Sequence, residues 1–139
     1  MCKRSTLMFV ALAMFLAWGT LNAAAEYPEG AKGFAGLVAG KITAKGENQI
    51  TVEVTKIEKT WKTSTAKNAE ALVGKSVIIK FDYSIYSKKP IRADEARKLF
   101  SILKVGDSDT FDCKNISGDY LTFLEMTAAQ KKRAGISEK

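Results

Sequence analysis

The chain has 139 residues, of which 22 are basic and 15 acidic, so its formal net charge is +7 at neutral pH. This length allows one domain with a hydrophobic core of its own. The sequence contains no histidine, which excludes Ser-His-Asp and Cys-His nucleophilic sites and removes the commonest general base and metal ligand.

The first 25 residues have the three-part layout of a secretory signal peptide. Lys3 and Arg4 supply positive charge, residues 7–18 are all apolar, and three alanines end at Ala25. The apolar run is too short to cross a bilayer as a helix. We expect cleavage after Ala25 and a secreted or periplasmic protein. Removal of Lys3 and Arg4 takes the 22 basic residues to 20 against 15 acidic ones, a net charge of about +5.

Two long strands are predicted after an irregular lead-in at residues 26–32. They span residues 33–45 and 49–61 and are joined by a turn at 46–48. The first carries three glycines, which mark bends or close backbone approaches within strands. A polar connection, residues 62–72, follows and ends in one helical turn.

The second long strand changes phase along its length. Apolar and polar residues alternate up to Val54, as in a strand with one buried face. Ile57 and Trp61 then lie on the opposite parity. We predict a β-bulge near residues 55–56, which bends this strand so that it serves two sheets of a small barrel.

A third strand and a helix are predicted next. The strand spans residues 75–83 and is followed by a loop at 84–91; its buried face comprises Val77, Ile79, Phe81 and Tyr83. The apolar stripe of the helix comprises Ala96, Leu99, Phe100 and Leu103. Asp94 and Glu95 are expected in the first helical turn, where the helix dipole favours negative charge.

Two more strands and a short helix complete the predicted domain. The strands span residues 109–115 and 120–126. Thr127 and Gln130 match a capping box, so a short C-terminal helix is predicted at residues 127–134, with an exposed basic cluster at residues 131–133.

The order strand, strand, strand, helix, strand, strand in residues 33–126 resembles the OB-fold. That fold is a five-stranded Greek-key barrel, and here the helix lies between strands 3 and 4. The resemblance implies a mainly β barrel domain at residues 33–126. Outside it we expect the signal peptide at residues 1–25, the irregular lead-in at 26–32, and a short helix and tail at 127–139. It also implies that a ligand lies across the second and third strands and nearby loops. A β-sandwich or another small barrel with one inserted helix is the alternative.

Little in the sequence suggests catalysis. Cys113 is the one cysteine after residue 25, and no zinc-finger, P-loop or dinucleotide-binding motif is present. We therefore expect no enzyme activity and no cofactor. Cys113 is expected to be a buried strand residue, the alternatives being an intermolecular bridge or a reactive thiol. Asp107, Asp109 and Asp112 are expected to be solvated, although an oxygen-ligand calcium site is conceivable there.

Aromatic and basic residues gather in the connections that follow the second and third strands. Aromatic rings can stack on bases or sugars, while lysines neutralise anions. In the alternative interpretation, Trp61 and Tyr83 plug the barrel and the lysines only confer solubility. The candidate ligand-binding residues are Trp61, Lys62, Lys67, Tyr83, Tyr86, Lys88, Lys89 and Arg92.

These features favour an exported, non-enzymatic binding or structural module of the periplasm or cell surface. Its expected partner is an anionic polymer such as an acidic glycan, or another protein. A single-stranded nucleic-acid-binding OB domain is the alternative, which export disfavours because most nucleic acid lies in the cytoplasm.

Overall fold

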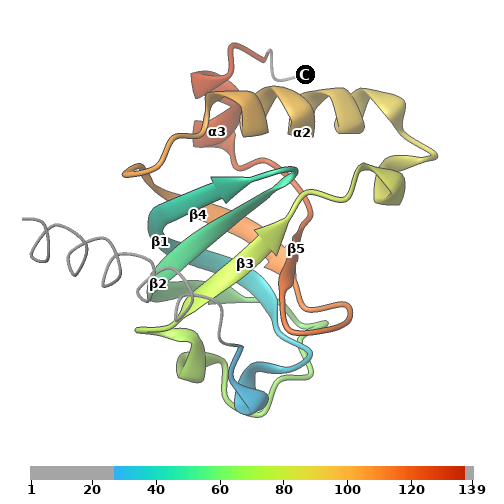
Figure 1. Cartoon of the computed structure of the whole chain (residues 1–139). Coiled ribbons are helices and arrows are strands. Elements are labelled where there is room, and N and C mark those ends of the chain that lie inside the picture. Colours follow the sequence, from blue (N-terminus) through green and yellow to red (C-terminus); the bar gives the residue numbers. More distant parts are fainter. Residues whose placement is uncertain (1–26, 137–139) are drawn as a thin grey trace, which may run out of the picture.

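A computed structural model describes residues 27–136, which form a closed five-stranded barrel (Figure 1). The predicted signal peptide and its cleavage site lie outside the described residues. The strands are β1 (Ala35–Gly46), β2 (Gln49–Thr60), β3 (Ser76–Lys80), β4 (Ser108–Lys114) and β5 (Leu121–Phe123).

The strands are neighbours in the order β1-β2-β3-β5-β4, and β4 closes the barrel by pairing with β1. All pairs are antiparallel except β3 with β5. A parallel pair needs a long crossover, which here contains the main helix and β4. The predicted fold class, a mainly β, OB-like barrel with one helix between strands 3 and 4, is confirmed.

Helices close the two ends of the barrel. The helix α2 (Pro90–Ile102) lies across one end beside the short helix α3 (Ala128–Arg133), and the opposite end carries two 3₁₀ turns (Figure 1). These turns are η1 (Glu29–Ala31) and η2 (Ala69–Leu72), and a third, η3 (Tyr83–Tyr86), precedes α2. No helix within residues 27–136 has the length and apolar character needed to span a membrane.

The predicted bulge is present in β2. Ala39 of β1 pairs with Lys56 and Gly40 pairs with Val54, so Thr55 is the extra residue. The bulge lets β2 bend around the barrel and returns Ile57 to the inner side, where it packs against the core. At Gly40 the two strands approach so closely that a Cβ would lie 2.4 Å from the Glu53 carbonyl oxygen.

The third strand is shorter than predicted. Val77, Ile79 and Phe81 are buried on one face as expected. The Asp82 carboxylate then accepts a hydrogen bond from the Ser84 amide at 3.0 Å and starts η3. Tyr83 therefore lies in a helical turn and not in the strand, because an Asp side chain stabilises a turn in place of strand pairing.

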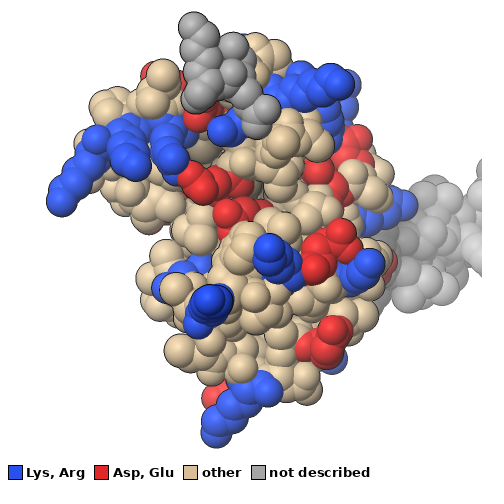
Figure 2. All heavy atoms as spheres, turned by 180° about the vertical axis from the view of Figure 1, so that it is seen from behind, with Lys and Arg blue, Asp and Glu red and all other residues tan. Residues whose placement is uncertain are grey.

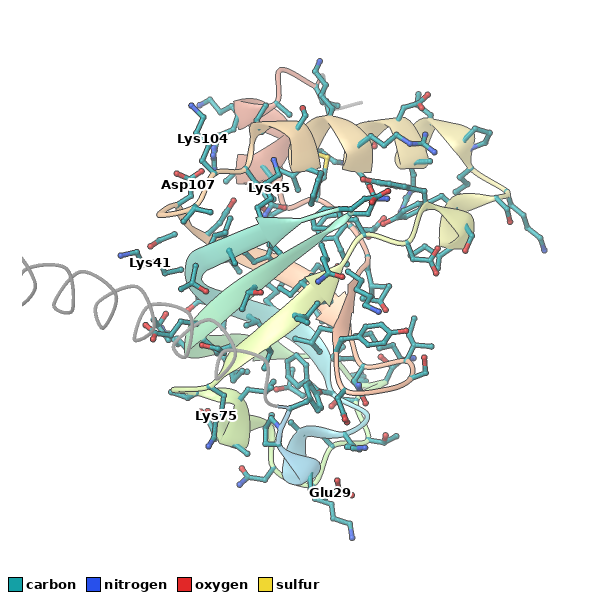
Figure 3. All side chains as sticks on the ribbon, viewed as in Figure 1. Glu29, Lys41, Lys45, Lys75, Lys104 and Asp107 are labelled. Atoms are coloured by element: carbon teal, nitrogen blue, oxygen red, sulfur yellow. The ribbon has the colours of Figure 1, made fainter. Side chains whose placement is uncertain are left out.

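The main helix begins earlier than predicted. Pro90 occupies its first turn, where proline's missing N–H and fixed φ are tolerated. Asp94 and Glu95 thus lie beyond the first turn, which contains no acidic residue; the predicted dipole interaction is wrong. At the other end, Lys45 Nζ donates to the carbonyl oxygens of Phe100 and Leu103 at 2.7 and 2.9 Å (Figure 3).

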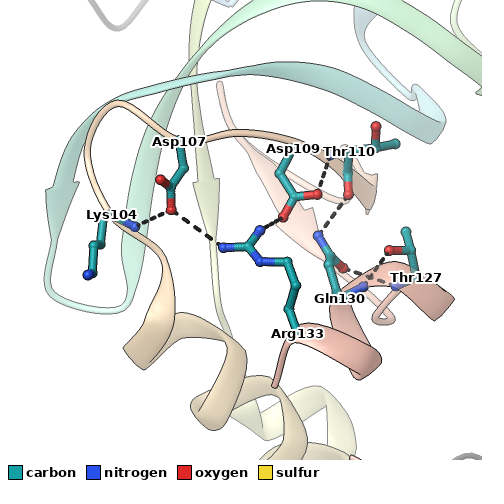
Figure 4. Close-up of polar contacts among 7 residues, drawn as sticks. All are labelled: Lys104, Asp107, Asp109, Thr110, Thr127, Gln130 and Arg133. Atoms are coloured by element: carbon teal, nitrogen blue, oxygen red, sulfur yellow. Dashed lines mark hydrogen bonds and ion pairs between the residues drawn. The ribbon is translucent and has the colours of Figure 1, made fainter. Parts of the chain in front are cut away.

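The C-terminal helix begins with a capping box between Thr127 and Gln130, and the Gln130 side chain also holds it to β4 (Figure 4). Gln130 accepts from the Thr127 amide at 3.0 Å and donates to the Thr110 carbonyl oxygen at 2.8 Å. Arg133 is exposed as expected, and its guanidinium group also donates to Asp109 at 2.9 Å. Cys113 is fully buried in β4 as predicted, and burial raises the pKa of its thiol.

Candidate functional site

The structure brings four of the eight candidate residues to one open pocket beside the start of α2. We call it the η3–α2 pocket; its volume is about 450 Å³. Its lining residues are Ile85, Tyr86, Ser87, Lys88, Lys89, Arg92, Leu124 and Glu125. The segment after β5 thus forms one wall and the loop between η3 and α2 forms the other.

Tyr86 forms a structural wall of this pocket. Its side chain is buried, and its hydroxyl donates a hydrogen bond to the Leu124 carbonyl oxygen at 2.6 Å. The Phe123 carbonyl oxygen lies 3.2 Å from the same hydroxyl and is a second, weaker acceptor. Burial raises the pKa of Tyr86, so the phenol stays protonated and keeps this bond. Because its hydrogen is already used, Tyr86 positions η3 and is not free to donate to a ligand.

The cationic groups of the pocket differ in their availability. Arg92 forms an ion pair with Glu125. Lys88 and Lys89 are exposed and form no ion pair with any acidic side chain of residues 27–136. Basic side chains gather at the end of the molecule where η3 and the start of α2 lie, next to acidic ones (Figure 2). The pocket lining therefore has a net positive charge, and two of its ammonium groups have no acidic partner within residues 27–136.

Tyr83 lies outside the pocket lining. It is half-buried in η3, and the guanidinium group of Arg97 lies 4.5 Å from the centre of its ring. This contact, between residues of η3 and α2, stabilises the turn next to the pocket. The aromatic face that the sequence suggested for ligand stacking is already occupied by a cation.

The other candidate residues, Trp61, Lys62 and Lys67, lie in the connection after β2. Lys62 and Lys67 are exposed. Trp61 is half-buried, and its indole Nε1 donates to Asp112 Oδ1 of β4 at 2.9 Å. Trp61 is thus neither a fully buried plug nor a free stacking surface, and it joins the β2–β3 connection to the barrel wall.

We expect Asp112→Asn to stabilise the protein at neutral pH. Burial raises the pKa of Asp112, and the Trp61 hydrogen bond opposes this rise only in part. The folded state therefore holds a proton more readily than the unfolded chain. The ionised carboxylate lowers stability by an amount that grows as the pH rises through the unfolded pKa and is complete above the folded pKa. Asparagine keeps the acceptor for Trp61 without the charge.

Urea unfolding at several pH values checks this expectation. The gain of Asp112→Asn should be complete above the raised pKa and should vanish as the pH falls below about 4, the ordinary value for Asp. Glu70→Gln, which removes an exposed carboxylate without an ion-pair partner in residues 27–136, is the matched control. A gain for Asp112→Asn that is independent of pH would contradict the assignment.

The sequence analysis missed the contact between the cation of Lys80 and the aromatic ring of Tyr120. Lys80 Nζ lies 4.1 Å from the centre of the Tyr120 ring, beside the β1–β2 turn. The open pocket there also has Glu47 and Asp82 in its lining. The resemblance to the OB-fold indicated this region of the barrel. Lys80 and Tyr120 are far apart in the sequence and come together only through the parallel pairing of β3 with β5. No local sequence pattern could therefore predict their contact.

The conceivable calcium site is not assembled. Asp107 and Asp109 bind Arg133 at 3.6 and 2.9 Å (Figure 4), and Asp112 binds Trp61 instead. In the part of the chain that the structure describes, no three His, Cys, Asp or Glu side chains are grouped so as to hold a metal ion.

The fold and the pocket define a small OB-like barrel whose helix-capped end carries an open, basic pocket. Comparison with protein-family models, with curated proteins and with solved structures finds no match for the chain. The function is therefore argued from the site itself.

Proposed function

We propose that the protein is an exported, non-enzymatic binding module of the periplasm or cell surface. In this proposal the η3–α2 pocket receives an anionic group of a glycan or of a protein partner. The observation that carries the proposal is the pair of exposed lysines, Lys88 and Lys89, which have no acidic partner in residues 27–136 and stand beside Arg92 in one concave site. Like charges in a cleft attract anions more strongly than isolated surface lysines do.

Single-stranded nucleic acid is the second candidate ligand, and the pair of Lys80 and Tyr120 favours it. An aromatic ring and a lysine are the groups that stack a base and neutralise its phosphate, although Lys80 Nζ already lies over one face of the Tyr120 ring. Glu47 and Asp82 line the same pocket, however, and repel a phosphate chain. This candidate therefore ranks below an anionic group bound in the η3–α2 pocket.

The double substitution Lys88→Ala/Lys89→Ala is expected to weaken binding of residues 26–139 to a fluorescent heparin fragment. Losing two lysine contacts to a polyanion should flatten the dependence of log K on log salt by about two counterions. Fluorescence anisotropy over a range of salt concentrations measures both quantities. A labelled single-stranded DNA and a polyglutamate peptide are titrated in parallel.

Lys62→Ala/Lys67→Ala is the matched control, since it removes two exposed lysines that lie in the connection after β2 and not in the η3–α2 pocket. It should leave the salt dependence close to that of the wild type. Equal losses in the two double variants would show that binding follows net charge and would contradict a role for the pocket. Tight binding of DNA alone, unaffected by Lys88→Ala/Lys89→Ala, would favour the second candidate.

A further inference from the structure

The ion pair of Arg92 and Glu125 lies where the η3–α2 pocket adjoins a smaller hollow. Tyr86, Arg92, Leu124 and Glu125 line both spaces. The two charged side chains are 41% and 51% exposed, so solvent and solutes reach them. A pair this exposed contributes little stability and exchanges its partners readily. Glu125 therefore occupies the position on Arg92 that an anionic group of a ligand would take.

The surroundings of this ion pair limit the kind of anion that fits. Glu95 and Lys131 line the adjoining hollow together with Arg92 and Glu125, so its charges balance and it adds no attraction for a densely negative chain. Ile85 is 40% exposed in the wall of the pocket, and Leu124 lies opposite. Next in sequence to the pocket, Ile91 is 70% exposed. Apolar groups beside a few charges suit a ligand of mixed character better than a densely sulfated or phosphorylated chain.

We infer that the partner of the η3–α2 pocket is an extended segment of another protein in which one carboxylate stands beside an apolar side chain. The carboxylate replaces Glu125 on Arg92, and the apolar side chain packs on Ile85 and Leu124. Lys88 and Lys89 attract the acidic segment and lie at the rim. This inference rests on the proposed function, because it names the partner of the same pocket.

Glu125→Gln tests the exchange directly, because glutamine keeps the size of the side chain and releases Arg92. The probe is a fluorescent peptide of alternating glutamate and leucine, compared with an all-glutamate peptide and a heparin fragment. We expect Glu125→Gln to bind the alternating peptide about two- to fivefold more tightly than the wild type, the equivalent of one exposed ion pair. The gain should disappear in Arg92→Gln/Glu125→Gln.

Glu95→Gln is the matched control. It removes the same charge from the adjacent hollow, and Glu95 forms no ion pair within residues 27–136. Equal gains in Glu95→Gln and Glu125→Gln would overturn the inference, since they would reflect general charge. Heparin binding that depends on Lys88 and Lys89, with no preference for the alternating peptide, would overturn the inference and leave the proposed function standing. Failure of every anionic probe to bind the wild type would overturn both.

Discussion

Phe81→Ala is expected to lower the free energy of unfolding by about 3–5 kcal/mol, the usual range for removing a buried aromatic ring. Phe81 is 3% exposed. Its ring stacks on Phe123 with centroids 4.6 Å apart and meets Phe100 edge-on at 5.0 Å. Phe81 follows β3, Phe123 belongs to β5 and Phe100 to α2, so one side chain joins three elements that are distant in sequence. Its loss leaves a cavity that none of them can fill without moving.

Urea unfolding followed by tryptophan fluorescence measures this effect. Ile91→Ala is the control, because it also removes an apolar side chain but from a position that is 70% exposed. It should change stability by no more than about 0.5 kcal/mol. A loss below about 1 kcal/mol for Phe81→Ala would contradict its place in the core and the contact between the barrel and α2.

Much of the fold could be predicted because its signals are local. Alternation located β2, the phase change at Val54 and Ile57 located the bulge, and Thr127 with Gln130 located the last helix. The prediction failed where two local signals competed. Tyr83 continues the alternation of β3, but the Asp82 turn prevails and starts η3.

The candidate site was predicted only in part, for reasons of distance along the chain. Lys88, Lys89 and Arg92 are close in sequence, so composition alone grouped them. Glu125, which pairs with Arg92, comes after β5 and reaches it only through the closure of the barrel. The same closure brings Trp61 next to Asp112, to which it donates a hydrogen bond. The sequence analysis had assigned Trp61 to the ligand-binding residues because it follows the second strand.

The second large effect is expected for Asn115→Ala, which should cost about 2–4 kcal/mol. Asn115 is 9% exposed, and its Oδ1 accepts from the Gly33 amide at 2.8 Å. Its Nδ2 donates to the carbonyl oxygens of Gly118 and Tyr120 at 3.1 and 2.9 Å. Alanine removes three hydrogen bonds, each worth about 1 kcal/mol, and leaves shielded main-chain groups without a partner. These bonds join the start of β1 to the turn before β5.

Two further substitutions separate the role of Asn115 from that of its surroundings. Asn115→Asp keeps the acceptor for Gly33 but loses both donors, so it should also be destabilising. Ser117→Ala removes only an exposed contact with the Tyr120 hydroxyl at 3.3 Å and should be nearly neutral. Hydrogen exchange should show faster exchange of the Gly33 amide in Asn115→Ala than in Ser117→Ala. Equal exchange rates of the Gly33 amide and equal unfolding midpoints in these two variants would show that Asn115 does not hold the β4–β5 turn against β1. In that case the Asn115 bond to Tyr120 would not explain why Tyr120 lies beside Lys80.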